Sequence, residues 1–549
     1  MPACRSKVLA ILAATAAILS LAAPAAAATP GYVETHADNP VSAAPDVTRP
    51  ATKHCTVALA EDFPSNATDG SPQSFSGTMM PPAACPGPWA KVVLDYTTTV
   101  SGRQYDRSGS LQVGGTTIWF GTTQEPDGPT PTTFSFSKDV TRYSALFHSP
   151  QPYSGGYVNY TSSVYTGVYR QTATLTFYEP DRAHPAASVP DVVRGVPVDD
   201  LNPGTPRRDV TLSDLPRNIT RAELEVTLKG NGCDEQWFTA VPDDVAAKFP
   251  GDGLCAAGPY REASFALDGR PAGTVGTYPH IYSGGIVPTL WRPVLAIDTL
   301  DMRPENLDLT PFAGTLVDGG SHQLSVSMSP LGDNWNVVTT LFLWTDHHAA
   351  RTSGALTQDT VAATPGLGST SAPTSTGQQY TLTAHRDDVV AGYVDTSAGR
   401  IDTRATYERQ FRNAGQVSDH GLIQSIDQSD RITQTSVSTR NGREVRDQRL
   451  VESYPISVDF SAASYVSDQN FSLEGTVHMA QDVGQVVREA GRSDVRGWTW
   501  RVDSNGVLAR ANGVTSESDG SSTTSYAGTD DLGRPYYRRI VTEHGKVVR

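Results

Sequence analysis

The sequence predicts an all-β protein: two adjacent jelly-roll-like β-sandwiches followed by a β-rich C-terminal domain. Gly (48 residues) and Pro (38) are plentiful among the 549 residues, and charged residues make up only 18%. Short runs of alternating apolar side chains recur between turn-forming clusters, as in residues 172–178 and 221–228. No long amphipathic helix interrupts these runs.

Residues 1–28 have the organisation of a secretory signal peptide. Arg5 and Lys7 precede a mostly apolar run over 8–23, and a stretch of small residues follows over 25–28. The apolar run is short for a membrane span, and a cleavage pattern follows it directly. We therefore expect a secreted protein.

The rest of the chain divides by composition. Strand-like segments form three blocks, separated by stretches rich in Pro, Asp, Thr, Ser and Gly. The last block also carries the hairpin signals Asn441-Gly442 and Asn505-Gly506. The expected segments are, in order, a flexible N-terminal segment (29–52), a first β-sandwich (53–184), a linker (185–209), a second β-sandwich (210–349), a second linker (350–378) and a β-rich C-terminal domain (379–549).

The charge balance excludes two classes of partner. The formal net charge is −15 and the isoelectric point is about 5.2. A general nucleic-acid binder needs a basic face, and an anionic membrane attracts polybasic segments. We therefore expect neither nucleic acid nor membrane as a partner, and we expect a monomer.

Four cysteines remain after loss of the leader, an even number that indicates disulfides in an exported chain. Three pairings are possible, and nearest-neighbour pairing, Cys55–Cys85 with Cys233–Cys255, is the simplest. Zinc sites usually hold Cys or His pairs at close spacing, which this sequence does not contain. We expect no metal.

Familiar catalytic motifs are missing. The chain has no G-x-S-x-G elbow, no H-E-x-x-H and no P-loop. Three carboxylate-containing segments stand out instead because they combine acids with Arg or aromatic residues. The segments are Gly102–Arg107, Gln124–Pro126 and Gly232–Phe238. From the residues alone each has an ordinary alternative: the first is a structural ion pair, the second a surface turn and the third a solvated loop acid.

These segments resemble the peptide N-glycanase A family, acidic amidases that release N-linked glycans from glycopeptides. The ordered match covers about Lys53–His348 and is not evident beyond the second linker. It includes, among others, Cys85-Pro86-Gly87-Pro88, Gly102–Arg107, Lys138-Asp139-Val140-Thr141, Asp234–Phe238, Gly258–Glu262, Leu290-Trp291-Arg292-Pro293 and Leu343-Trp344-Thr345-Asp346. A more distant likeness is to the bacterial peptide N-glycanase F type, a pair of jelly rolls with the active site between them.

The resemblance implies a site and a reaction. Asp106 is expected to be the principal catalytic residue, with Glu125 and Glu235 as its partners. Asp234 is expected to bind substrate. Which of Asp234 and Glu235 faces the site stays open. No cofactor is needed for hydrolysis of the Asn–N-acetylglucosamine amide of an N-glycopeptide or N-glycoprotein. The expected substrate-binding residues are Arg107 and Arg292, for hydroxyl and amide oxygens, and Trp237 and Trp291, as flat faces for the sugar.

The same residues suggest a pH dependence. Glu235 has Trp237, Phe238 and Asp234 as sequence neighbours, which should raise its pKa, whereas Asp106 beside Arg107 should stay ionised to lower pH. Two other functions remain open. A glycoside hydrolase also uses two carboxylates, and a non-catalytic glycan-binding protein would need none.

Overall fold

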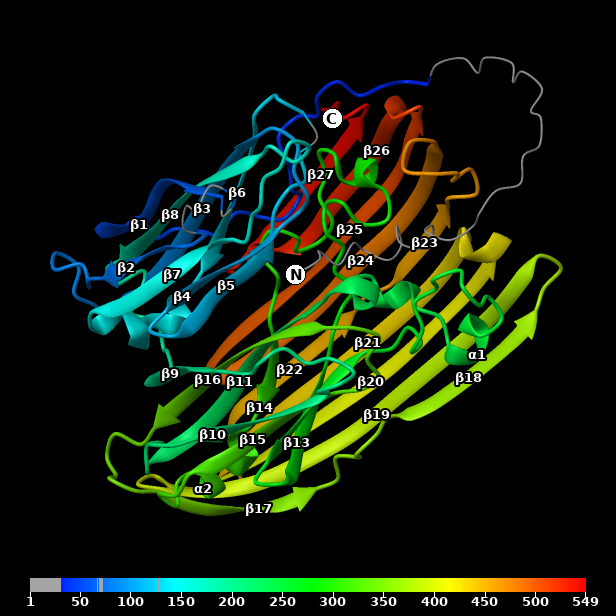
Figure 1. Cartoon of the computed structure of the whole chain (residues 1–549). Helices are drawn as coiled ribbons and strands as arrows, with labels where there is room; N and C mark the ends of the chain where they lie inside the picture. The colour runs from blue at the N-terminus through cyan, green and yellow to red at the C-terminus, as the bar shows by residue number, and fades with distance from the viewer. Residues whose placement is uncertain (1–30, 67, 69–72, 127) are drawn as a thin grey trace, which may run out of the picture.

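The computed structural model describes residues 31–66, 68, 73–126 and 128–549, so the expected signal peptide lies outside the described residues. Antiparallel sheets dominate, and the fold class predicted from the sequence is confirmed. In Figure 1 the first sandwich (blue to cyan) and the second (green) lie beside a very large sheet (yellow to red). Within the described residues, no helix is long and apolar enough to cross a membrane.

The first sandwich pairs two four-stranded sheets. Their orders are β1-β8-β3-β6 and β2-β7-β4-β5. The inward-facing side chains form one aromatic-rich core around Tyr96, Trp119 and Tyr157. The strands are β1 (His54–Ser65), β2 (Phe75–Met79), β3 (Lys91–Ser101), β4 (Ser108–Val113), β5 (Thr116–Thr122), β6 (Thr132–Asp139), β7 (Gln151–Tyr157) and β8 (Val168–Tyr178).

The second sandwich repeats this design. Its sheets have the orders β10-β15-β12-β13 and β14-β11-β16-β9. The central strands β11 and β16 are buried over most of their length, which the continuous apolar run of β16 predicts and the alternating pattern of β11 does not. The strands are β9 (Val192–Val196), β10 (Arg207–Leu212), β11 (Ile219–Gly230), β12 (Glu262–Leu267), β13 (Arg270–Gly276), β14 (Glu305–Asp308), β15 (His322–Met328) and β16 (Trp335–Thr345).

The C-terminal domain is a single 12-stranded antiparallel sheet. Along its long strands buried and exposed residues alternate, so one face is covered and the other meets solvent. The strands are β17 (Ser353–Asp359), β18 (Gly366–Pro373), β19 (Gly377–Thr396), β20 (Gly399–Ser418), β21 (Ile423–Arg440), β22 (Arg443–Ser453), β23 (Ile456–Ser461), β24 (Phe471–Glu489), β25 (Arg492–Ala511), β26 (Val514–Thr529), β27 (Pro535–Glu543) and β28 (Lys546–Val547).

Helices are short and lie in the connections. The two α-helices and six 3₁₀ turns of the described residues cap strands or shape loops rather than form a layer. They are η1 (Thr141–His148), η2 (Gly232–Asp234), η3 (Trp237–Thr239), α1 (Asp243–Ala246), η4 (Pro288–Trp291), η5 (Thr310–Phe312), α2 (Ala313–Leu316) and η6 (Asp419–Gly421).

The covered face of the large sheet shares one hydrophobic core with the second sandwich. Phe411 and Val477 from the sheet belong to the same buried cluster as Trp237 and Leu290. Fully buried ion pairs also lie at this boundary, including Arg386–Glu262. The second sandwich and the C-terminal domain are therefore packed as one unit.

One hairpin signal is confirmed and the other is wrong. Asn441 and Gly442 both have positive φ and join β21 to β22. Gly506 lies in the middle of β25, in register with Gly520 of β26. A Cβ on Gly506 would come within 2.6 Å of Thr289 Oγ1, so this glycine provides room for η4 against the sheet rather than a turn.

Two segments predicted as linkers contribute strands. Within 185–209, β9 pairs with β16 of the second sandwich. Within 350–378, both β17 and β18 pair with β19. The Pro and Asp of the first segment and the Thr, Ser and Gly of the second are compatible with short edge strands as well as with a flexible connection, and composition alone does not separate the two.

The expected flexible N-terminal segment is instead held against the rest of the chain over its described part. The backbone N–H of Glu34 donates to Ser518 O (2.8 Å), and that of Val41 donates to Pro293 O (3.0 Å). Further along, the Lys91 ammonium donates to Thr48 O (2.9 Å).

The disulfide prediction is confirmed. Cys55 bonds to Cys85 in the first sandwich, and Cys233 bonds to Cys255 in the second. Each closes a loop inside one domain and contributes about 2–4 kcal/mol by restricting the unfolded chain. The second bond holds the loop that carries Glu235.

Candidate active site

Asp106 and Glu125 come from neighbouring loop segments of the first sandwich. Asp106 lies just before β4, and Glu125 lies just after β5. The backbone N–H of Thr123 donates to Arg107 O (3.0 Å), and the N–H of Arg107 donates to Thr123 Oγ1 (2.9 Å). These two bonds hold the segments side by side and fix the two carboxylates relative to each other.

The second sandwich supplies the opposite wall. Glu235 directly follows η2, and Lys229 lies next to the end of β11. The loop between β13 and η4 carries Tyr282 and Gly284. The Lys229 ammonium lies 4.9 Å from the centre of the Tyr282 ring, which places this loop beside the end of β11.

Gly284 connects the two walls. Its backbone N–H donates to Oδ2 of Asp106 at 3.0 Å. A Cβ at this position would lie 2.0 Å from Oε2 of Glu125 and 3.3 Å from Oδ2 of Asp106. The two carboxylates therefore meet over one glycine of the other sandwich, and a larger residue at 284 would collide with them.

Burial and mutual charge shift the pKa values of the two glutamates in the same direction. Burial, followed by the charge of Asp106, raises the pKa of Glu125 to about 8. The same two causes raise the pKa of Glu235 to about 7, partly offset by Lys229. All three carboxylates keep some exposure to solvent, so water can reach them.

Asp106 differs from the expectation that Arg107 keeps its pKa low. Burial raises the pKa of Asp106, and the Gly284 N–H, Lys229 and Arg107 offset only part of this effect. The negative charge of Asp106 in turn raises the pKa of both glutamates. Burial lowers the pKa of the Lys229 ammonium, although the nearby Glu235 and Asp106 counteract that effect.

Asp234 does not contact the site, which corrects its expected role in substrate binding and leaves Glu235 as the acid that faces the crevice. The Asp234 side chain is fully buried and ion-paired with Arg261. It also accepts hydrogen bonds from the Gly332 N–H (2.9 Å) and from Trp335 Nε1 (2.7 Å). Although burial alone would raise its pKa, Arg261 and these donors hold it below the ordinary value.

Trp237 and Trp291 cannot offer faces to a sugar, so this prediction is wrong. Their exposed fractions are 2% and 0%, and both belong to the core of the second sandwich. Trp237 packs on Phe411 of the C-terminal sheet, and Trp291 Nε1 donates to Gly285 O (2.8 Å). They hold the two active-site loops of this sandwich in place from behind.

Two arginines flank the carboxylates. Arg107 donates to Gln104 Oε1 (2.7 Å), and its charge offsets part of the rise in the pKa of Asp106. Arg292 is 95% buried and ion-paired with Glu34 at 3.7 Å, and its charge offsets part of the rise in the pKa of Glu125. Arg107 is more open to solvent than Arg292, so it is the more accessible of the two to a substrate.

Three features of the site were not predicted. Lys229 carries no sequence signal, and Gly284 lies in a segment that resembles the family without indicating a role, because only the fold brings the two residues to Asp106. The third is an aromatic pair with one exposed member: Tyr105 and Tyr165 stack with ring centres 4.0 Å apart, and Arg103 lies 5.1 Å from the Tyr165 ring. Tyr105 is 41% exposed and adjoins Asp106, which marked it in the sequence as part of the Tyr-Asp-Arg segment.

In the described part of the chain, no group of three or more His, Cys, Asp or Glu side chains is arranged to hold a metal ion. The crevice offers carboxyl groups, one ammonium, guanidinium groups and backbone N–H donors. The two β-sandwiches therefore meet at three carboxyl groups of the kind that acid–base hydrolysis uses.

Comparison with known sequences gives the family. A sequence model of "Peptide N-acetyl-beta-D-glucosaminyl asparaginase amidase A" matches residues 40–362, and a model of the PNGase A C-terminal domain matches residues 379–456. The chain belongs to this family. The expectation that the resemblance ends at the second linker is therefore wrong, because the C-terminal domain matches as well.

One sequence relative agrees with this assignment. The peptide-N4-(N-acetyl-beta-glucosaminyl)asparagine amidase A of Prunus dulcis is 29% identical over 412 residues, which are 69% of this chain and 69% of that protein. A structure of PNGase F from Flavobacterium meningosepticum aligns with a TM-score of 0.34 at 14% identity, over 53% of this chain and 96% of that one. A structure of PNGF-II aligns with a TM-score of 0.38 at 13% identity, over 53% of this chain and 66% of that one.

Proposed function

We propose that this protein hydrolyses the amide between Asn and the innermost N-acetylglucosamine of N-glycopeptides, and that Asp106, Glu125 and Glu235 carry the reaction. One observation supports this assignment most strongly: the three carboxylates converge from both sandwiches, and the charge of Asp106 raises the pKa of both glutamates. Below about pH 7 the two glutamates are protonated, and the proposed reaction then needs Asp106 in its ionised form.

Amide hydrolysis requires an activated water and a protonated leaving nitrogen. Asp106, held by the Gly284 N–H, orients the water and accepts a proton from it. Glu235, with a pKa of about 7, donates a proton to the nitrogen as the C–N bond breaks. The products are a peptide with Asp in place of Asn and a 1-amino sugar, which hydrolyses to ammonia and the free glycan. No cofactor enters these steps.

The remaining groups bind and orient the substrate. Glu125, protonated below about pH 8, donates a hydrogen bond to the sugar or to the amide oxygen. Tyr105 is 41% exposed beside Asp106 and, unlike the two buried tryptophans, can contact a substrate through the exposed part of its side chain. Arg107 supplies guanidinium donors on the same side.

The mass of a glycopeptide after treatment distinguishes this function from its alternatives. Conversion of the glycosylated Asn to Asp identifies an amidase. A peptide that retains N-acetylglucosamine on intact Asn identifies a glycoside hydrolase. An unchanged glycopeptide that binds the protein identifies a non-catalytic glycan-binding protein. We expect conversion to Asp.

We further propose that the protein acts outside the cell as a monomer and without nucleic acid. The leader-like residues 1–28 and the two disulfides support secretion. One chain supplies all three carboxylates, so the site needs no second copy. A net charge of −15 supports the absence of a nucleic-acid partner. Peptide sequencing of the exported protein and its mass in solution test these points.

A further inference from the structure

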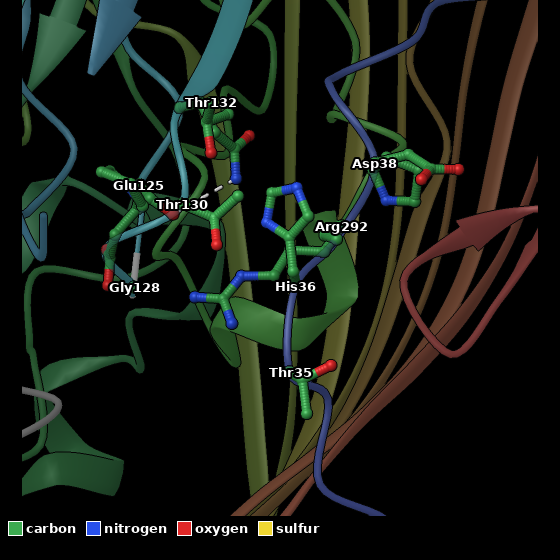
Figure 2. A pocket seen from close by; sticks show the side chains of 12 residues that line it. Thr35, His36, Asp38, Glu125, Gly128, Thr130, Thr132 and Arg292 are labelled. Atoms are coloured by element: carbon green, nitrogen blue, oxygen red, sulfur yellow. Dashed lines mark hydrogen bonds between the residues drawn. The ribbon is translucent and has the colours of Figure 1, made fainter. Parts of the chain in front are cut away.

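The side of Glu125 that faces the N-terminal segment is nearly filled. Figure 2 shows His36 of that segment and the guanidinium of Arg292 on one side of a small pocket and Thr130 on the other. The pocket has room for about one water molecule, so neither a sugar nor a peptide residue fits it. A substrate bound at Asp106 must therefore extend from the crevice in another direction.

The C-terminal sheet reaches the active-site loops on another side. Gly475 of β24 lies against the loop that carries Gly284, since a Cβ on Gly475 would come within 3.4 Å of Ile286 Cγ2. Four residues before Gly475, about 13 Å along the strand, Phe471 begins β24 and is paired with Arg510 of β25. The strand pair thus passes the active-site loop and ends beyond it in an aromatic and a basic side chain.

The guanidinium of Arg510 is held in place by aromatic rings. Its Cζ lies 5.7 Å from the centre of the Phe471 ring, and the ring of Tyr465 stacks on Phe471 at 5.9 Å. Arg510 Nε is buried and has no hydrogen-bond partner among the described residues. A guanidinium fixed on a ring keeps its donors in one orientation, which lowers the entropic cost of binding an anion.

A second guanidinium, that of Arg103, links Arg510 to the catalytic carboxylates. Arg103 Cζ lies 5.1 Å from the ring of Tyr165, which stacks on Tyr105. The charge of Arg103 offsets part of the rise that burial causes in the pKa of Glu125. Burial lowers the pKa of Arg510, and the charge of Arg103 lowers it further. Because salt screens exposed charges beyond roughly 8–10 Å, the two guanidinium groups lie near each other.

The chemistry of this pair indicates what it binds. Asp468 counteracts part of the effect of Arg103, yet the pKa of Arg510 stays below its ordinary value. The fold thus brings two like charges together beside the crevice of a protein whose net charge is −15. A bound anion would relieve their repulsion, and the planar fork of a guanidinium matches a carboxylate in particular.

We propose that Arg510 and Arg103 bind a carboxylate of the substrate, so that the C-terminal domain takes part in substrate selection. The site rests on the proposed function, because that function places a glycopeptide at Asp106. An acidic residue of the peptide and an acidic sugar of the glycan present the same planar anion. The experiment therefore tests both sources.

Binding measured without turnover tests the site. The Asp106→Asn protein is titrated with two pairs of glycopeptides, and dissociation constants are obtained by calorimetry. In one pair the same neutral glycan is carried by a peptide in which Glu or Gln flanks the glycosylated Asn. In the other pair one neutral peptide carries a glycan that ends in an acidic or a neutral sugar. The acidic member of a pair should bind about three- to tenfold more tightly, the effect of one charge-assisted hydrogen bond. The pair that shows this preference identifies the source of the carboxylate.

The preference should depend on both arginines. Adding Arg510→Gln to the Asp106→Asn protein should remove it, and Arg103→Gln, in a different domain, should act in the same direction. Arg501→Gln, which changes an exposed arginine of the same strand, is the matched control and should keep the preference.

Equal binding of the acidic and neutral members in both pairs would overturn the site. A preference that survives Arg510→Gln and Arg103→Gln in proteins of unchanged thermal stability would overturn it too. Failure of the proposed function has a different signature: the wild-type protein would leave glycosylated Asn intact while the preference for the acidic member still depended on Arg510.

Discussion

The backbone N–H of Gly284 donates a hydrogen bond to Oδ2 of Asp106 at 3.0 Å, across 178 residues of sequence and between two domains. This bond stabilises the ionised form of the aspartate at a place where burial opposes ionisation. It also brings the loop of the second sandwich close enough to exclude any side chain at 284. The junction of the two sandwiches is therefore what creates the site.

Asp106→Asn should reduce turnover by about 10²–10⁴-fold, the effect of a lost acid–base group, and leave the fold intact. Steady-state kinetics on a glycopeptide and a thermal melt check this. Asp427→Asn, whose side chain is 77% exposed on the C-terminal sheet, is the control and should behave as wild type. Near-normal turnover in Asp106→Asn would remove this residue from the mechanism.

The pH profile should be a bell on the acidic side of neutrality. Glu235 must be protonated to act as donor, so activity falls as pH rises through its pKa of about 7. Asp106 must be ionised, so activity also falls at low pH, beginning above the ordinary range of an aspartate because burial raises its pKa. Glu235→Gln should abolish the alkaline limb in whatever activity is left. Persistence of that limb in an active Glu235→Gln enzyme would transfer the donor role to Glu125.

Glu125→Gln should stabilise the fold at alkaline pH. The unfolded carboxyl ionises near pH 4.5, whereas the folded one stays protonated up to about pH 8. Between pH 4.5 and pH 8, rising pH therefore favours the unfolded state of the wild type more and more. Above pH 8, the folded state carries the full free-energy cost of ionising this carboxyl group. The gain in melting temperature from Glu125→Gln should grow from pH 4.5 to pH 8.5. A gain that does not vary with pH would contradict the buried, charge-coupled position of Glu125.

Asp234→Ala should destabilise the protein, because Asp234 contacts no part of the crevice. Removing it leaves the fully buried Arg261 without its charge partner, which costs about 3–5 kcal/mol. Denaturant unfolding measures this loss, and the KM of folded enzyme at low temperature should change little. A large rise in KM at unchanged stability would restore the substrate-binding role that the sequence suggested.

A chain ending at residue 378 should not fold to a soluble enzyme. The C-terminal sheet covers the core of the second sandwich, and Arg409 of β20 donates to Arg261 O (2.9 Å), next to the Asp234 ion pair behind Glu235. Truncation would expose this core and leave Arg261 without that support. Expression, solubility and turnover of the fragment check the prediction, and an active soluble fragment would show that the sheet is dispensable.

Much of this fold follows from local sequence. Alternating side chains predict the strands, and the order and spacing of four cysteines allow the correct pairing by its simplicity. The Asn-Gly signal shows the limit of local reasoning. Asn441-Gly442 forms a turn, but Gly506 lies in mid-strand because η4 packs closely on it, and that neighbour lies over 200 residues away in sequence.

The site shows the same limit. The resemblance to the family points to Asp106, Glu125 and Glu235, whereas from the residues alone each of their segments has an ordinary alternative. The sequence does not show which side chain around Glu235 faces the crevice. Asp234 and Trp237 turn away from it in two successive 3₁₀ turns. Lys229 and Gly284 reach Asp106 only through the pairing of domains, which no single segment encodes.

Hydrolysis in heavy-oxygen water tests the central claim most directly. A defined N-glycopeptide is treated with wild-type protein in labelled water, and the peptide product is sequenced by mass spectrometry. We predict Asp at the former glycosylated position with one labelled oxygen in its side-chain carboxyl group, and no such product with Asp106→Asn on the same timescale. Intact, unlabelled Asn that still carries N-acetylglucosamine would contradict the assignment of the three carboxylates to an amidase.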